Sequence, residues 1–214
     1  MPPVNRSPRT HVYVDGFNLY YRALRGTPYR WLDLSALCRA LLSKNDVRSV
    51  AYFTARVSNR PGDPGQATRQ QMYLRALATD PLVTVEFGQF LTNRVRAYLV
   101  NPPVRGARTV EVWRTSEKGS DVNLATRMLI DAYRKRCEVV VLISNDSDLA
   151  GPLRVVRDEL GLRVGVLDPS PRANKTLHAA STFYKHIRAG ALASSQFPLA
   201  MEDSQGKFTK PRGW

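Results

Sequence analysis

The chain has 214 residues, of which 43% are hydrophobic, and 32 Lys and Arg against 18 Asp and Glu give it a formal net charge of +14. This composition excludes a disordered chain, and a chain of this length buries enough surface to fold without disulfides or a structural metal. Its two cysteines, Cys38 and Cys137, lie far apart and form no CxxC motif. We therefore expect two buried free thiols rather than a zinc finger or a disulfide framework.

The compartment and the type of partner follow from the charge and the apolar segments. The first ten residues are polar and proline-rich rather than a signal peptide, and the longest uncharged apolar run, 139–143, is far shorter than the roughly 18 residues of a membrane span. We predict a cytoplasmic protein without a membrane segment. The positive charge favours an acidic partner, nucleic acid first and an anionic membrane surface second, although a basic soluble protein explains the charge as well.

The first half of the chain alternates short apolar segments, which predict strands, with amphipathic segments, which predict helices. In the segment 33–43, leucines at helical spacing follow Asp33, which we assign as an N-cap. In chain order, we predict strands at 11–14, 48–57 and 82–87 and helices at 17–24, 33–43 and 66–79.

The second half begins with two strand-like segments, 94–100 and 109–114, which we predict to form a hairpin that projects from the sheet. Ser120 is the expected N-cap of the helix that follows. The remaining predictions are helices at 120–136 and 149–160, one short helix within 176–189, a buried strand at 138–144 and a last strand at 163–167. The alternation and the apolar central strands predict an α/β fold with a mostly parallel sheet and helices on both faces.

Acidic residues gather where the predicted strands end. Asp15, Asp168 and the pair Asp146 and Asp148 each follow a strand, and Asp121 lies at the start of a helix. In a parallel sheet these positions share one edge, where ligands bind. Because clustered carboxylates repel one another, they need a cation or raised pKa values, and oxygen ligands without His or Cys favour Mg²⁺ or Mn²⁺.

Each of these residues also has a simpler structural interpretation. Asp15 and Gly16 suit a turn, Asp121 suits the first turn of a helix, and residues 145–148 suit a helix cap, with Ser147 or Asp146 as the cap itself. The convergence of all of them on one edge favours a metal site.

Three segments resemble the signature blocks of NYN-domain proteins, in the LabA-like branch of the PIN-like nuclease superfamily. They are VDGFNL at 14–19, EKGSDVNL at 117–124 and SNDSDL at 144–149. The resemblance covers residues 10–190, which we take as the domain, and leaves 191–214 as a C-terminal extension. It implies a Rossmann-like PIN-type fold and a divalent-metal-dependent ribonuclease. Many relatives have Gly where this chain has Asn145, a difference that affects the local turn.

The resemblance also assigns residues to the reaction. It implies that Asp15, Asp121 and Asp146 hold Mg²⁺ or Mn²⁺, directly or through water, that Asp148 accompanies them, and that Asn18 is the asparagine of the first block. The metal would activate the water that hydrolyses the phosphodiester. Lys118, beside Asp121, is a candidate for contact with substrate phosphate; a solvated loop charge is the alternative.

The predicted hairpin is the most basic local stretch, and aromatic side chains accompany its arginines. Cations interleaved with stacking rings are typical of proteins that bind single-stranded RNA. The arginines that we predict to contact RNA are Arg94, Arg96, Arg105 and Arg108, near Tyr98 and Trp113. Alternatively, the hairpin is exposed to solvent or forms the edge of a dimer. The sequence is therefore also compatible with a homo-oligomer.

Two other functional classes compete with a ribonuclease. A non-catalytic RNA-binding or regulatory module would keep the basic surface without using the carboxylates for catalysis. A phosphatase of the haloacid dehalogenase kind also has an aspartate after the first strand, but it needs a second one two residues later, where this chain has Phe17. The three signature blocks favour the ribonuclease.

Overall fold

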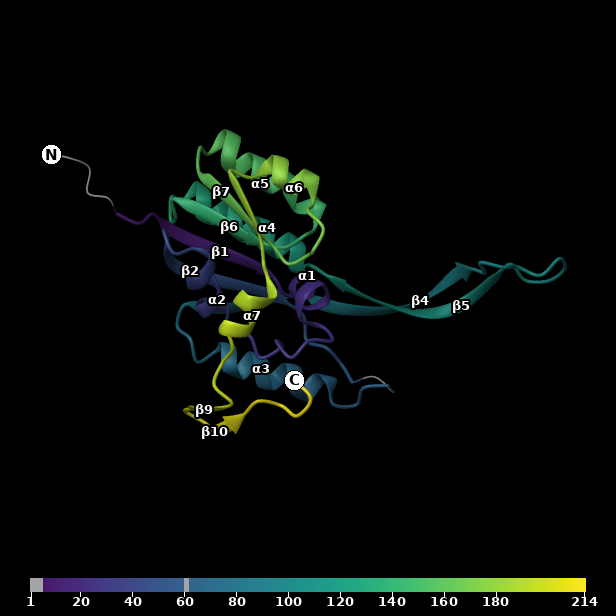
Figure 1. Cartoon of the computed structure of the whole chain (residues 1–214). Helices are drawn as coiled ribbons and strands as arrows, with labels where there is room; N and C mark the ends of the chain where they lie inside the picture. Colours follow the sequence, from purple (N-terminus) through teal and green to yellow (C-terminus); the bar gives the residue numbers. More distant parts are fainter. Residues whose placement is uncertain (1–5, 60–61) are drawn as a thin grey trace.

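The computed structural model describes residues 6–59 and 62–214 (Figure 1). Its centre is a six-stranded sheet in the order β3-β2-β1-β6-β7-β8, in which all neighbouring strands are parallel. The strands are β1 (Arg9–Asp15), β2 (Asp46–Thr54), β3 (Val83–Phe87), β6 (Val139–Ile143), β7 (Arg163–Asp168) and β8 (Phe183–His186). The predicted parallel α/β fold is confirmed.

The strand order changes direction between β1 and β6. From β1 the chain builds outwards through β2 and β3, whereas β6, β7 and β8 build outwards on the other side. In an open parallel sheet, the connections after the two strands at such a switch point lead away from each other and leave a crevice, where ligands bind. Here the crevice lies between the end of β1, at Asp15, and the end of β6, at Ile143.

Helices cover both faces of the sheet, as predicted, because neighbouring strand residues point to opposite sides. Val12 and Val14 pack into one hydrophobic core cluster and Tyr13 into the other. One side carries α2 (Leu34–Leu41), α3 (Gln66–Leu77) and α7 (Ala189–Ser194), and the other carries α4 (Ser120–Tyr133), α5 (Ala150–Arg154) and α6 (Lys175–Ala180) (Figure 1). Cys38 and Cys137 are buried free thiols, as predicted.

Short helical turns complete the connections. α1 (Gly16–Leu19) and the π-helical turn η1 (Tyr20–Leu24) follow β1, in place of the single helix predicted at 17–24. The 3-10 turn η2 (Ser147–Leu149) and the π-helical turn η3 (Val155–Glu159) flank α5. The predicted N-cap of α2 is confirmed, since the Asp33 side chain accepts a hydrogen bond from the Ala36 N–H at 2.9 Å.

The helix predicted at 120–136 is confirmed as α4, but its N-cap and its end differ from the prediction. Gly119, not Ser120, is the N-cap residue, and its φ of 95° lies in the left-handed region that favours glycine. The helix ends at Tyr133 rather than at 136, because Lys135 turns the chain away with a φ of 54°.

The last strand of the sheet differs from the prediction. The short helix predicted within 176–189 is confirmed as α6, but the strand at 163–167 is not the last, because β8 follows α6 and adds a sixth parallel strand. Phe183 packs against one core cluster and Tyr184 against the other. This alternation has the period of a strand, but over four residues it is too short to distinguish from a helical pattern.

The predicted hairpin is confirmed and is longer than expected. It consists of β4 (Gln89–Tyr98) and β5 (Thr109–Lys118), which pair antiparallel from Gln89 and Lys118 at the base to Tyr98 and Thr109 near the tip. We call residues 89–118 the arm. Figure 1 shows that the arm projects far from the rest of the molecule.

The last residues fold back beneath α3. They contain the small hairpin of β9 (Ala200–Asp203) and β10 (Gly206–Thr209), where Asp203 forms an ion pair with Arg75 at 2.6 Å. Trp214 lies against Tyr73, with ring centres 5.6 Å apart. In the part of the chain that the structure describes, no helix is both long and apolar enough to cross a membrane.

Candidate metal-binding cleft

An open cleft of about 480 Å³ lies at the switch point of the sheet. Its lining includes four residues that the sequence predicted to act together: Asp15, Asn18, Asp121 and Asp146. The other lining residues are Phe17, Tyr21, Arg22, Phe90, Glu117 and Ser120. We call this site the acidic cleft, because four carboxylates face a single arginine.

Ser144, the residue after β6, links the Asp15 carboxylate to the backbone of Asp146 at the switch point. Its buried hydroxyl donates to Asp15 Oδ2 at 2.9 Å and accepts from the Asp146 N–H at 3.0 Å. Asp146 also caps η2 by accepting from the Asp148 N–H at 3.0 Å. The capping role expected for Asp146 is therefore confirmed, and the same residue lines the acidic cleft.

Gly16 allows β1 to pass directly into this site. A Cβ atom on Gly16 would lie 2.6 Å from Tyr52 Cζ and 2.7 Å from the Phe53 carbonyl oxygen. These distances are too short for real atoms, so a glycine must follow Asp15. The Asp15 side chain then caps α1 by accepting from the Asn18 N–H at 3.0 Å.

A second set of hydrogen bonds fixes the loop after β6. Asn18 Oδ1 accepts from the Asn145 N–H at 2.9 Å, and Asn145 Nδ2 donates to Asp168 Oδ2 at 2.8 Å. Asp168 is fully buried and also accepts from the Tyr184 hydroxyl. Asp168 thus holds the loop in place and does not line the acidic cleft, whereas Asn18 joins the two loops.

Asp121 and Glu117 also line the cleft. Glu117 Oε1 accepts from the Ser120 N–H at 3.0 Å, which supports the start of α4 and leaves Asp121 exposed in its first turn. Partial burial, followed by the charges of Asp15 and Asp146, raises the pKa of Asp121 to about 6. Burial also raises the pKa of Asp15, against the hydrogen bonds from Asn18 and Ser144.

These pKa shifts and the types of side chain in the cleft indicate which ligand the site suits. Both carboxyl groups are harder to ionise, first because of burial and then because other carboxylates lie near them, and a bound cation would favour their charged forms. All the side-chain donors are oxygen atoms, which suits Mg²⁺ or Mn²⁺. Within residues 6–59 and 62–214, however, no three His, Cys, Asp or Glu side chains are close enough to hold an ion together. An ion in this cleft would therefore need water molecules among its ligands.

The structure does not bring all the predicted site residues to the cleft. Asp148 and Lys118 are exposed beside it but are absent from its lining. The four predicted RNA-binding arginines lie along the arm and are all exposed. Arg94 and Arg96 share one face of the arm with Tyr98 and Trp113, because Arg94 pairs with Trp113 across the strands, whereas Arg105 and Arg108 belong to the loop at the tip.

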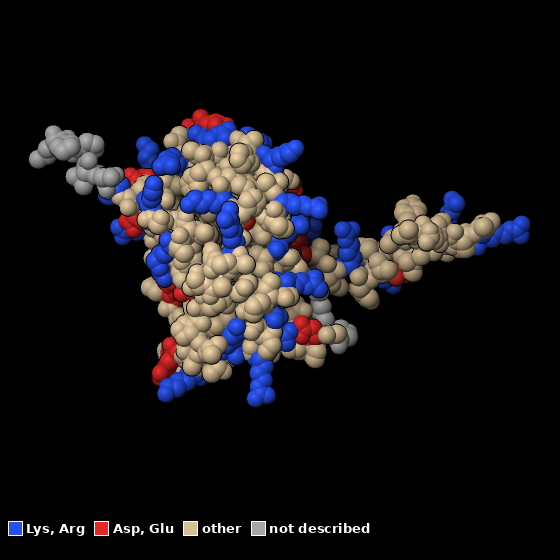
Figure 2. All heavy atoms as spheres, viewed as in Figure 1, with Lys and Arg blue, Asp and Glu red and all other residues tan. Residues whose placement is uncertain are grey.

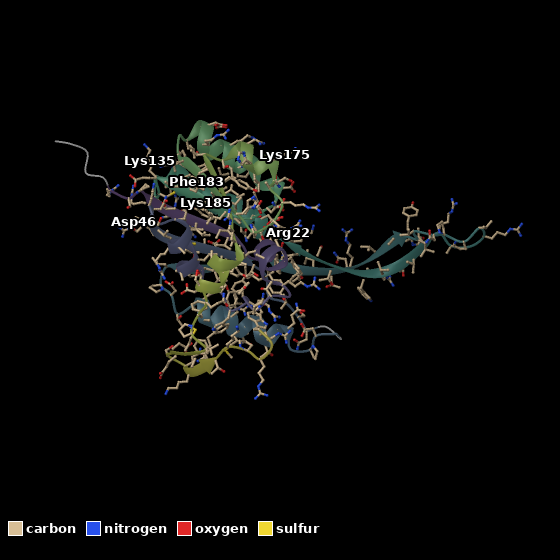
Figure 3. The ribbon with its side chains drawn as sticks, in the orientation of Figure 1. Arg22, Asp46, Lys135, Lys175, Phe183 and Lys185 are labelled. Carbon is tan, nitrogen blue, oxygen red and sulfur yellow. The ribbon has the colours of Figure 1, made fainter. Side chains whose placement is uncertain are left out.

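Sequence reasoning missed Glu117 and Arg22. Glu117 is the first residue of the second signature block, so its position beside Gly119 and Asp121 was a usable signal. Arg22 had no signal, because it reaches the cleft only through the turn after α1. Figure 3 shows its side chain next to α1, near the base of the arm. Lys and Arg are spread over the visible surface of the domain, with Asp and Glu in small groups (Figure 2).

A second cavity, of about 360 Å³, adjoins the acidic cleft. Phe17 and Tyr21 line both sites. The second cavity also has four other aromatic residues in its wall: Tyr20, Tyr52, Tyr73 and Trp214. We call it the aromatic cavity.

A parallel sheet with carboxylates at its switch point is consistent with a PIN-like protein. The family model for the NYN domain matches residues 9–188, and the chain belongs to this family, which is a family of PIN-like nucleases. The LabA-like branch stays a prediction.

Two known proteins resemble this chain over most of its length. A Pseudomonas putida (strain DSM 28022 / S16) protein named 6-hydroxy-3-succinoylpyridine 3-monooxygenase HspA is 31% identical over 236 residues, which cover 96% of this chain and 75% of the relative. A crystal structure of a Vibrio parahaemolyticus RIMD 2210633 protein of unknown function superposes with a TM-score of 0.56 at 17% identity, over 91% of this chain and 99% of the other. The second similarity concerns the fold alone.

Proposed function

We propose that the protein is a divalent-metal-dependent ribonuclease that acts on single-stranded RNA in the cytoplasm. The observation that supports this most is the convergence of Asp15, Asp121 and Asp146 on one cleft at the switch point of the sheet. Membership of a nuclease family and the basic surface are consistent with it.

The residues of the acidic cleft would divide the work of hydrolysis. Bound Mg²⁺ or Mn²⁺ would polarise a phosphodiester oxygen and lower the pKa of a water. Asp15, Asp121 and Asp146 would hold the ion, with Ser144 and the Asn18 N–H keeping Asp15 in one orientation. Asp148, just outside, would orient water. Arg22 places a positive charge in the wall, where it can stabilise the charge that develops on the phosphate.

The arm would bind the strand outside the cleft. Phe90 and Glu117, which pair at its base, line the acidic cleft, so the arm starts where the chemistry takes place. Its exposed arginines and the exposed rings of Tyr98 and Trp113 can contact phosphates and stack on bases. Lys118, at the same base, would contact a phosphate next to the cleft.

A cleavage assay tests this function directly. Purified protein is incubated with labelled single-stranded RNA and Mn²⁺, with an Asp146→Asn variant prepared in the same way. We expect cleavage by the wild type that disappears when the ion is chelated and is absent in the variant. Equal cleavage by both proteins would show a contaminant or a wrong assignment of the site.

One observation favours a second function. The Pseudomonas putida relative carries the name of a monooxygenase that acts on a substituted pyridine, and the aromatic cavity can enclose a single ring. A monooxygenase takes one oxygen atom from O₂ and needs two electrons from a reductant. Consumption of O₂ with NADH and FAD that depends on added 6-hydroxy-3-succinoylpyridine would support this function; its absence, together with RNA cleavage, would exclude it.

A further inference from the structure

The aromatic cavity lies at the same edge of the sheet as the acidic cleft. Thr54, the last residue of β2, and Gly16, the first residue after β1, both line it. Because Phe17 and Tyr21 line both sites, a ligand can extend from one into the other without leaving the surface. The aromatic cavity is therefore placed to hold a group next to the one bound among the carboxylates.

The walls of the aromatic cavity are fixed by contacts outside it. The Tyr73 hydroxyl donates to the Leu32 carbonyl at 2.9 Å, which anchors the tyrosine ring against the core. Trp214 packs on this ring and on Trp31, and Arg30 Nη2 donates to the carbonyl of the preceding residue, Gly213. Rings held in this way can receive a flat ligand at a small entropic cost.

The charge of the aromatic cavity is opposite to that of the acidic cleft. Arg25, Arg30 and Arg69 line it, and Asp63, which pairs with Arg69, is its only lining acid among the described residues. The Arg25 guanidinium lies over the Tyr21 ring, 5.5 Å from its centre, at the boundary with the acidic cleft. The Gln66 side chain adds an amide to the wall. The cavity thus combines flat apolar surfaces with positive charge and a donor and acceptor pair.

We propose that the aromatic cavity binds the base of one nucleotide in the RNA strand whose phosphodiester lies in the acidic cleft. A base is flat and can stack on the rings, and its hydrogen-bonding edge can pair with the Gln66 amide. The phosphate attached to its nucleotide can contact Arg25. The size agrees, because 360 Å³ is at the small end of ligand pockets, enough for one base and too small for a strand. This inference rests on the proposed ribonuclease function and adds a subsite to it.

An abasic scan tests the subsite. Binding of a short single-stranded RNA is measured without divalent ions, so that nothing is cut, while an abasic nucleotide is moved through the strand one position at a time. For the wild type we expect a position at which the missing base weakens binding about tenfold or more, the effect of losing one stacked base, and which is separate from any position stacked on the arm. In Trp214→Ala and in Tyr21→Ala this penalty should largely disappear.

The end of α4 supplies a matched control. Tyr133 is 75% exposed and lies outside both sites and the arm, so Tyr133→Ala should keep the penalty at the same position. If Trp214→Ala does not fold, Tyr21→Ala still tests the subsite, because Tyr21 is 50% exposed and its replacement should leave the fold intact. The subsite is overturned if every position with a penalty keeps it in both cavity variants, or if no position shows a penalty, even if Mn²⁺-dependent cleavage is found. Failure of cleavage with a normal abasic pattern would instead overturn the ribonuclease function.

Discussion

The acidic cleft and the arm meet at Phe90 and Glu117, but they are built in opposite ways. In the cleft, Asp15, Ser144 and Asp146 are joined by hydrogen bonds at the end of two buried strands. The arm is a two-stranded ribbon whose arginines are exposed, and one of them, Arg94, has only a distant ion pair with Glu111 at 3.6 Å. A rigid site suits chemistry that needs fixed geometry, whereas an exposed ribbon suits contact with a long and variable strand. If this division is correct, variants should separate cleavage from binding.

The largest expected effect is the loss of cleavage in Asp15→Asn. Asn keeps the size of the buried side chain but removes the charge that would hold the ion. We expect the cleavage rate to fall by at least about 10³-fold, equivalent to several kcal/mol of lost transition-state stabilisation. RNA affinity without divalent ions should stay within about twofold of the wild type, because screening limits repulsion between the exposed strand and one carboxylate.

The matched control for Asp15→Asn is Asp158→Asn. Asp158 is an exposed aspartate that pairs with Arg157 on η3, away from both sites. This variant should cleave like the wild type. An Asp15→Asn protein whose rate stays within about tenfold of the control would contradict the role of the cleft.

The arm should show the reverse pattern. We expect replacement of Arg94, Arg96, Arg105 and Arg108 by Gln to weaken RNA binding and to leave the turnover rate at saturating RNA within about twofold, since no phosphate in the cleft loses a contact. For each arginine that contacts a phosphate, the slope of log affinity against log salt should fall by about 0.7. Filter binding at several salt concentrations gives this slope, and an unchanged slope would remove the arm from the RNA site.

A third prediction tests why the cleft is rigid. Gly16→Ala places a Cβ atom against Tyr52 and the Phe53 carbonyl, and overpacking of this kind destabilises proteins by about 1–3 kcal/mol. In a chain of this size, each kcal/mol lowers the Tm by about 2–4 °C. Gly190→Ala, in α7, is the control, because no atom lies within 4 Å of its added Cβ. A melting curve for Gly16→Ala that matches this control would show that the turn tolerates a side chain.

The smallest expected effect concerns Asp121, whose folded-state pKa of about 6 is above the ordinary value of 3.8. Between these pH values the folded protein binds a proton that the unfolded chain has lost, so the contribution of Asp121 to stability decreases as the pH rises to about 6. Without divalent ions at pH 7, Asp121→Asn should therefore be more stable than the wild type, by at most about 1 kcal/mol because the side chain is exposed.

Melting curves at two pH values check this prediction. The advantage of Asp121→Asn should disappear near pH 3, below both pKa values, where the wild-type carboxyl group is mostly protonated in both states, and it should also disappear at pH 7 when Mn²⁺ stabilises the wild type. If Asp121→Asn is less stable than the wild type at pH 7 without ions, then ionised Asp121 does not destabilise the folded protein, which contradicts this prediction.

The sequence predicted the parts of the fold that have strong local patterns. The uninterrupted apolar run at 139–143 predicted a buried central strand, and the convergence of Asp15, Asp121 and Asp146 followed from their positions at the ends of elements. β8 escaped prediction because four residues are too few to show a period. Asp168 was considered with the cleft residues, yet it is buried, because Asn145 and Tyr184 come from separate elements to bind it.

The aromatic cavity could not have been predicted. Tyr21, Tyr73 and Trp214 lie in three segments far apart in the sequence, and no local pattern connects them. The Asp15–Gly16 pair predicted a turn. Only the distance from a Cβ atom on Gly16 to the Tyr52 ring shows why no other residue fits. Such features depend on how elements pack, which a single sequence does not display.

Titration of Mn²⁺ into the protein by calorimetry tests the central claim most directly. We expect binding of Mn²⁺ by the wild type, and a loss of this binding in a variant that combines Asp15→Asn with Asp146→Asn. The fold of the variant is checked by circular dichroism, and Asp158→Asn should bind like the wild type. The absence of Mn²⁺ binding to the wild type, with or without RNA, would contradict the account and favour a non-catalytic RNA-binding module.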